Sequence, residues 1–131
     1  PRKRLMRAMS SRINKMLRGH VSRTGRTLMY TTFADAEDVM QHFEALFKPG
    51  MRRWNYGWFW NHDHLIPRKE YNPMDEEDLR KCQSRQNLVP EYCIENSRKG
   101  AKLPPVDVLL KLKSIWPSSW NGQIPSSAFH V

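Results

Sequence analysis

The net positive charge of this chain lies at one end. The first 34 residues contain nine basic side chains and no acidic one, and the first carboxylate is Asp35. Of the 22 basic residues, the remaining 13 balance the 13 acidic ones, so the net charge of +9 belongs wholly to the leading segment. Such a segment is not expected to join a core. The asymmetry predicts a cationic arm beside a small neutral body.

Within the arm, residues 2–18 have the pattern of an amphipathic helix. Leu5, Met9, Ile13 and Met16 recur at helical spacing, and Gly19 is well placed to end the helix. This pattern suits a mitochondrial targeting helix, a helix on an anionic membrane surface, or a helix that tracks RNA phosphates. It also suits a helix that packs its apolar stripe on the protein's own core.

The residues that follow, 19–30, are rich in hydrogen-bond donors and would order along a polyanion. We expect contacts to RNA or another anionic surface from the basic residues of the arm and from two arginines further along the chain. These are Arg2, Lys3, Arg4, Arg7, Arg12, Lys15, Arg18, Arg23, Arg26, Arg52 and Arg53.

The chain of 131 residues with nine prolines allows one small domain of short elements. Helical patterns cover residues 32–48 with Thr32 as cap, 72–86 with Asn72 as cap, and 106–115. The predicted fold class is mainly α, small and irregular, with three to four short helices, an aromatic loop or short strand segment, and extended N- and C-terminal arms. The predicted divisions are a basic arm (1–30), a helical body (31–116) with an aromatic loop (51–66), a linker (96–105) within the body, and an anchoring tail (117–131).

Aromatic residues alternate in the stretch from 51 to 66, which suits one face of a strand or an irregular loop. Their rings could stack on unpaired bases beside the neighbouring arginines. We favour the alternative that they anchor a protein interface, together with apolar residues of the tail. The expected anchors are Trp54, Tyr56, Trp58, Trp60, Trp120, Ile124 and Phe129.

His62-Asp63-His64 could contribute to a metal site, since histidines two apart on an extended segment point the same way. Cys82 and Cys93 could complete a zinc set, but ten residues separate them where structural zinc sites usually have two to four. No metal site is therefore predicted. The same two cysteines could form a disulfide, or remain reduced as we favour.

The sequence contains no phosphate-binding glycine loop, nucleophile elbow or HExxH motif. We expect a protein without catalytic activity, cofactor or transmembrane segment, held in a larger assembly rather than free as a monomer. The favoured role is a mitochondrial ribosomal protein that contacts rRNA and neighbouring proteins. The alternative is an accessory subunit of a respiratory-chain complex or ATP synthase, with anionic lipid or an acidic subunit as the partner of the arm. A small metal-dependent enzyme that uses His62, His64 and the cysteines is the third hypothesis.

Overall fold

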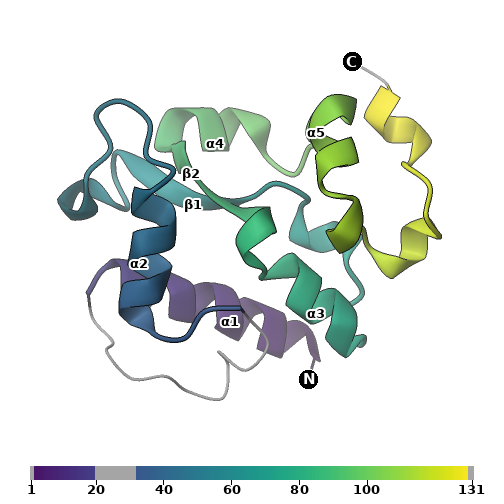
Figure 1. The fold of residues 1–131 in the computed structure, drawn as a ribbon, viewed down its shortest axis with the longest axis horizontal. Helices are drawn as coiled ribbons and strands as arrows, with labels where there is room; N and C mark the ends of the chain where they lie inside the picture. Colours follow the sequence, from purple (N-terminus) through teal and green to yellow (C-terminus); the bar gives the residue numbers. More distant parts are fainter. Residues whose placement is uncertain (1, 20–31, 130–131) are drawn as a thin grey trace.

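The computed structural model describes residues 2–19 and 32–129, with the backbone alone for residues 2–5. This part contains five α-helices and one two-stranded antiparallel sheet, so the protein is a small mixed α/β fold (Figure 1). The prediction of a mainly α fold is wrong. The elements are α1 (Arg2–Leu17), α2 (Ala36–Glu44), β1 (Trp60–His64), α3 (Glu76–Cys82), β2 (Leu88–Tyr92), α4 (Cys93–Lys99) and α5 (Val106–Lys111).

The sheet pairs β1 with β2 in a register that sets Trp60 opposite Tyr92 and His64 opposite Leu88. In Figure 1 the sheet crosses the middle of the molecule, between α4 on one side and α1 and α2 on the other. Pro90 lies within β2 and cannot donate a ladder hydrogen bond. It is tolerated because both strands of a two-stranded sheet are edge strands.

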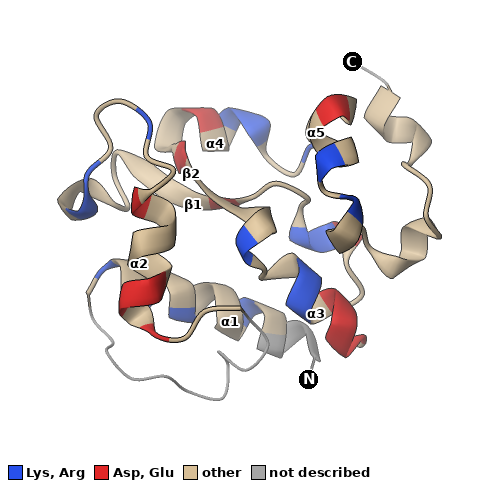
Figure 2. Cartoon of the chain, viewed as in Figure 1, with Lys and Arg blue, Asp and Glu red and all other residues tan. Residues whose placement is uncertain are grey.

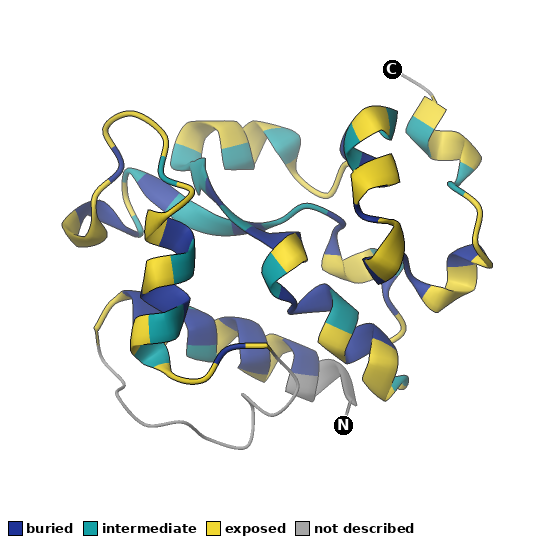
Figure 3. Cartoon of the chain, in the orientation of Figure 1, coloured by how far each residue is buried: buried dark blue, intermediate teal, exposed yellow. Residues whose placement is uncertain are grey.

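Helix α1 is part of the body and not a separate arm. Ile13, Met16 and Leu17 are buried in one hydrophobic cluster, while Met6 and Met9 are buried in a second (Figure 3). The expectation that this segment stays out of the core is therefore wrong. One face of the helix is apolar throughout, so its charged side chains can project to solvent while that face packs.

Helices α2 and α3 begin at aspartates that the sequence analysis did not choose as caps. Asp35 accepts a hydrogen bond from the Asp38 N–H at 2.8 Å and starts α2, in place of Thr32. Asp75 accepts one from the Glu77 N–H and starts α3, in place of Asn72. Both are side-chain caps at the positive end of a helix, where a carboxylate is favoured.

The predicted linker over residues 96–105 is wrong in its first half. Helix α4 follows β2 directly and continues to Lys99, so only residues 100–105 are irregular before α5. The predicted extended tail is wrong too, because it turns twice, at Ser118–Trp120 and Ser126–Phe129. Within the described residues, no helix has the length and apolar character needed to cross a membrane.

The alternating aromatic residues do not share one strand face. Residues Arg53–Asn55 form a short turn, and the strand starts only at Trp60. Tyr56, Trp60 and Trp120 are buried in the protein's own core, and Ile124 packs against it half-buried. The three buried aromatic residues therefore stabilise the fold and are not exposed anchors, while an anchoring role of Ile124 stays a prediction. Trp54, Trp58 and Phe129 are exposed.

Candidate functional site

A pocket of about 680 Å³ lies alongside β1, between α1 and α4. Its walls come from four segments of the chain that are far apart in sequence. The lining residues are Arg7, Ser10, Ser11 and Asn14 of α1, His62, Asp63 and His64 of β1, Pro67, Arg68 and Lys69 of the following turn, and Asn96, Gly100 and Ala101 of α4 and its end.

The turn after β1 is held in place by a buried asparagine. Asn87 accepts a hydrogen bond from the Ile66 N–H at 2.8 Å and donates to the carbonyl oxygens of Ile66, at 3.1 Å, and Cys82, at 2.9 Å. The amide is fully buried and both of its polar atoms are bonded. This arrangement fixes the backbone two residues after His64, directly before Pro67, which lines the pocket.

The imidazole of His64 is oriented by a series of hydrogen-bonded side chains that reaches α1. Its Nε2 lies 3.1 Å from Oε1 of Gln83, and Nε2 of Gln83 donates to the Ser10 hydroxyl at 3.1 Å. An amide oxygen only accepts, so Nε2 of His64 carries the proton and Nδ1 keeps its lone pair. Burial, followed by the nearby His62, lowers the pKa of His64 well below its ordinary value, so the ring is neutral at pH 7.

His62 is held by a second polar chain to the same helix. Its Nδ1 lies 2.8 Å from the Tyr56 hydroxyl, which donates to Oδ1 of Asn14 at 2.7 Å. The hydroxyl proton is used toward Asn14, so Nδ1 of His62 donates to the Tyr56 oxygen. Burial lowers the pKa of His62 to about 4. Both histidines are thus neutral, and their ring centroids lie 6.0 Å apart.

Asp63 is directed toward α4, on the opposite face of the strand from the histidines. The Lys99 ammonium donates to both carboxylate oxygens of Asp63, to Oδ1 at 3.1 Å and to Oδ2 at 2.9 Å. It also donates to the His64 carbonyl oxygen at 2.7 Å. Burial raises the pKa of Asp63, and the hydrogen bond from Lys99 opposes that rise. Asn96 is one helical turn before Lys99 and lines the same pocket.

These groups can perform two kinds of chemistry. Asp63 and Asn96 offer carboxylate and amide oxygens, which are the donors that suit Mg²⁺, Ca²⁺ and Mn²⁺. Nδ1 of His64 offers a lone pair that can accept a proton. Among the described residues, no group of three or more His, Cys, Asp or Glu side chains could hold a metal ion. An all-protein cage such as a structural zinc site is not formed there.

The structure separates the histidines from the cysteines that were considered with them. Cys82 is buried in the second hydrophobic cluster, and Cys93 accepts a contact from the Asn61 amide at 3.5 Å. Both are free thiols, so the disulfide left open by the sequence is not formed. The sequence analysis identified His62 and His64 but missed Gln83, Asn87, Asn96 and Lys99 as their neighbours. The sequence holds no local signal for these residues, because the non-local pairing of β2 with β1 brings them near the histidines.

Of the basic residues predicted to meet an anion, Arg7 lines the pocket. Arg53 instead forms ion pairs with Glu37 and Glu44, both at 2.9 Å, and their carboxylates raise its pKa. Arg52 donates to the Met51 carbonyl oxygen. The side chains of Arg2, Lys3 and Arg4 lie outside the described part, as do Arg23 and Arg26. Arg12, Lys15 and Arg18 are placed on or just after α1.

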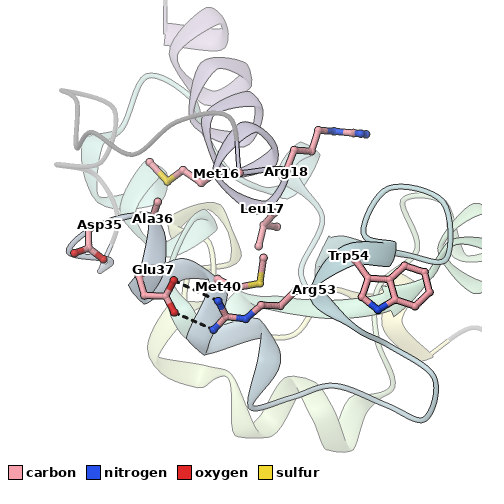
Figure 4. A pocket seen from close by; sticks show the side chains of 10 residues that line it. Met16, Leu17, Arg18, Asp35, Ala36, Glu37, Met40, Arg53 and Trp54 are labelled. Carbon is pink, nitrogen blue, oxygen red and sulfur yellow. Dashed lines mark hydrogen bonds and ion pairs between the residues drawn. The ribbon is translucent and has the colours of Figure 1, made fainter.

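A second pocket, of about 570 Å³, lies between the end of α1 and the start of α2 (Figure 4). Its lining includes Met16, Leu17 and Met40, and the Arg53–Glu37 ion pair crosses it. Trp54 stands at its rim. Its charged groups already have partners, because Asp35 accepts the capping hydrogen bond of α2 and Glu37 is paired with Arg53.

The chain is similar to one curated protein, "Uncharacterized protein L426" of Acanthamoeba polyphaga mimivirus. The two are 27% identical over 106 residues, which make up 76% of this chain and 47% of the viral protein. The chain thus spans about half the length of this relative. No family model matches the chain. No solved structure matches it significantly.

Proposed function

We propose that this protein hydrolyses phosphodiester bonds of nucleic acid with the help of a divalent cation. The observation that carries the proposal is one pocket whose lining includes an oriented neutral histidine, a carboxylate, an amide side chain and three basic side chains. The oxygen donors are Asp63 and Asn96, the proton acceptor is His64, and the basic residues are Arg7, Arg68 and Lys69.

The two oxygen donors fit a cation that completes its shell with water and substrate. Mg²⁺ is usually bound by one or two carboxylates together with phosphate oxygens, and not by a full set of protein ligands. Asp63 supplies the carboxylate and Asn96 the second oxygen. A cation held there would neutralise the negative charge that develops on the phosphate during attack.

His64 is placed to act as the general base. A water molecule attacks phosphorus, its proton passes to Nδ1 of His64, and the bond between phosphorus and the leaving sugar oxygen breaks. The leaving oxygen takes a proton from solvent. Gln83 and Ser10 keep the ring in the tautomer that this step requires, and such positioned bases contribute about 10²–10⁴-fold to a rate.

The rim of the pocket supports a polyanionic substrate. Arg7, Arg68 and Lys69 are exposed on α1 and on the turn after β1, and further basic residues are spread over the neighbouring elements (Figure 2). Guanidinium groups bind phosphate oxygens in a bidentate manner, which fixes the position of a nucleic-acid backbone without reading its sequence.

The proposal is tested by incubating the purified chain with labelled single-stranded DNA, duplex DNA and RNA in Mg²⁺ or Mn²⁺. We expect cleavage with either cation, none in EDTA, and a large loss in Asp63→Asn and Asn96→Ala. Asn121→Gly, which keeps a backbone conformation with φ of 52° that glycine accepts, is the control for loss of an asparagine amide. Cleavage that persists in EDTA, or in both pocket variants, would refute the proposal.

A second candidate function is binding of nucleic acid without cleavage, as in the ribosomal protein expected from the sequence; the respiratory-chain or ATP synthase subunit would bind anionic lipid or an acidic subunit instead. The exposed tryptophans Trp54 and Trp58 favour a binding role. In the same experiment this candidate predicts retention of the labelled strand with no cleavage under any condition. The mitochondrial location stays a prediction of the sequence alone.

A further inference from the structure

We propose that Trp54 and Trp58 form a stacking platform for unpaired bases of a nucleic-acid strand that runs along α1. This inference rests on the proposed function, because the strand that would stack on the tryptophans is the same strand whose phosphodiester would enter the pocket beside β1. It adds that the substrate contains at least one single-stranded stretch next to the cleaved bond.

The two tryptophans are presented by a rigid loop. Trp54 is 72% exposed and Trp58 64%, and their ring centroids lie 5.8 Å apart with planes inclined at 41°. Asn55 fixes the loop between them, since it accepts from the Arg52 N–H at 2.8 Å and donates to the Gly50 carbonyl oxygen at 2.9 Å. The fold therefore holds both large rings in exposed positions.

Glycine is required at the centre of this loop. Gly57 has a φ of +97°, and a side chain there would meet the Arg18 guanidinium at 2.8 Å. Arg18 also lies over the Tyr56 ring, 5.5 Å from its centroid. The loop that carries the tryptophans is thus in contact with the end of α1 through a cationic side chain.

One face of α1 connects this loop with the pocket. Arg7, Ser11 and Asn14 follow one another at helical spacing and line the pocket, and Arg18 continues the same row. About 16 Å along the helix axis separate Arg7 from Arg18, given the rise per residue of a helix. The row is polar or basic throughout, which suits a phosphate backbone laid along it.

The charge around the rings favours a nucleic-acid partner over an apolar protein surface. Trp54 stands at the rim of a pocket that also includes Arg18, as Figure 4 shows, and Arg52 is exposed beside it. The two carboxylates of that pocket are already engaged, since Asp35 accepts the capping hydrogen bond of α2 and Glu37 forms an ion pair with Arg53. An unpaired base stacks on an indole while its phosphate contacts a neighbouring guanidinium. An apolar partner would instead have to cover these arginines.

The test measures binding of a fluorescent single-stranded 12-nucleotide DNA in Ca²⁺ at moderate salt, with a strand of abasic sites of equal length as the matched ligand. We expect Trp54→Ala/Trp58→Ala to bind the normal strand about tenfold or more weakly and the abasic strand as well as the wild type does. Phe129→Ala, which removes an exposed ring from the far end of the chain, should bind both strands normally.

Equal binding of the normal strand by the double variant, an equal loss for both strands, or no binding by the wild type would overturn the inference. In the first case the tryptophans contact something other than bases, such as a protein. The proposed function is tested separately, by measuring cleavage of the labelled strands. Base-dependent binding without cleavage would support the stacking platform and refute the proposed hydrolysis. Cleavage together with unaltered binding by the double variant would support the hydrolysis and refute the platform.

Discussion

Lys99 and Asp63 form the closest charged contact inside the candidate site, with Nζ 2.9 Å from Oδ2 and 3.1 Å from Oδ1. Both side chains are largely buried, with relative exposures of 21% and 10%. The ammonium thus covers the carboxylate that is proposed to bind a cation. One positive charge would have to leave this carboxylate for another to bind well, since two cations at one carboxylate repel each other.

Lys99→Met is therefore expected to bind divalent cations more tightly than the wild type. The variant keeps the apolar stem but removes the competing charge, so the Asp63 carboxylate becomes free for a cation. Isothermal titration with Mn²⁺ should show a dissociation constant lower by about tenfold, which corresponds to 1.4 kcal/mol. Without metal the variant should be less stable, because it leaves a buried carboxylate without its partner.

Lys102→Met is the matched control, since Lys102 is an exposed lysine three residues further along the chain. It should bind Mn²⁺ as the wild type does. An unchanged or weaker affinity in Lys99→Met would show that the lysine assists the cation and does not compete with it.

Asn87→Ala should destabilise the protein by about 2–4 kcal/mol. The substitution leaves the Ile66 N–H and two carbonyl oxygens without their partner in a fully buried site. Urea denaturation followed by circular dichroism measures the change. Gln86→Ala removes an exposed amide from the adjacent position and should change stability by less than about 0.5 kcal/mol. Equal effects of the two substitutions would contradict the role given to Asn87.

Ile13→Ala should cost about 2–5 kcal/mol of unfolding free energy, because Ile13 is fully buried where α1 meets the first hydrophobic cluster. Lys15→Ala, on the exposed side of the same helix, should have little effect. Thermal or urea unfolding of the two variants compares them directly. If Ile13→Ala were as stable as the wild type, α1 would not be packed on the body in solution.

The two thiols should differ strongly in reactivity. Burial raises the pKa of Cys82 to about 12, while Cys93 is half-buried and its pKa is raised less. The reactive thiolate of Cys82 is therefore almost absent at pH 8. Iodoacetamide should modify one cysteine per native chain, and mass spectrometry should locate the label at Cys93. Rapid labelling of Cys82 in the native protein would contradict its place in the core.

The helical parts of the fold follow from local patterns that a sequence displays. The apolar stripes of α1 and α2 repeat at helical spacing. The structure places α1 close to its predicted range, whereas α2 begins four residues later and ends four residues earlier than the predicted 32–48. Strand β2 could not be found in this way. It is five residues long, contains Pro90, and is defined by pairing with a strand that precedes α3. Such non-local pairing leaves no local periodicity to read.

Only part of the candidate site could be predicted from the sequence. His62 and His64 stood out because two histidines two apart on a strand point the same way. The sequence suggests cysteines as possible partners in a zinc set, which the cysteine spacing argues against, and the structure places Cys82 in the core. The cluster of Asn, Ser and Gly around Asn96 predicts a linker. In the structure Asn96 instead lies on α4, the helix that follows β2 directly, and it lines the pocket.

The most direct test of the proposed hydrolysis is the single-turnover cleavage rate of His64→Ala compared with that of His42→Ala. His42 is also a half-buried histidine, whose Nε2 donates to the Leu88 carbonyl oxygen at 2.7 Å, but it does not line the pocket beside β1. We predict a loss of about 10²–10⁴-fold in His64→Ala and near wild-type cleavage by the folded His42→Ala protein. Equal rates for the two variants would contradict the assignment of His64 as the general base and, with it, the proposed site.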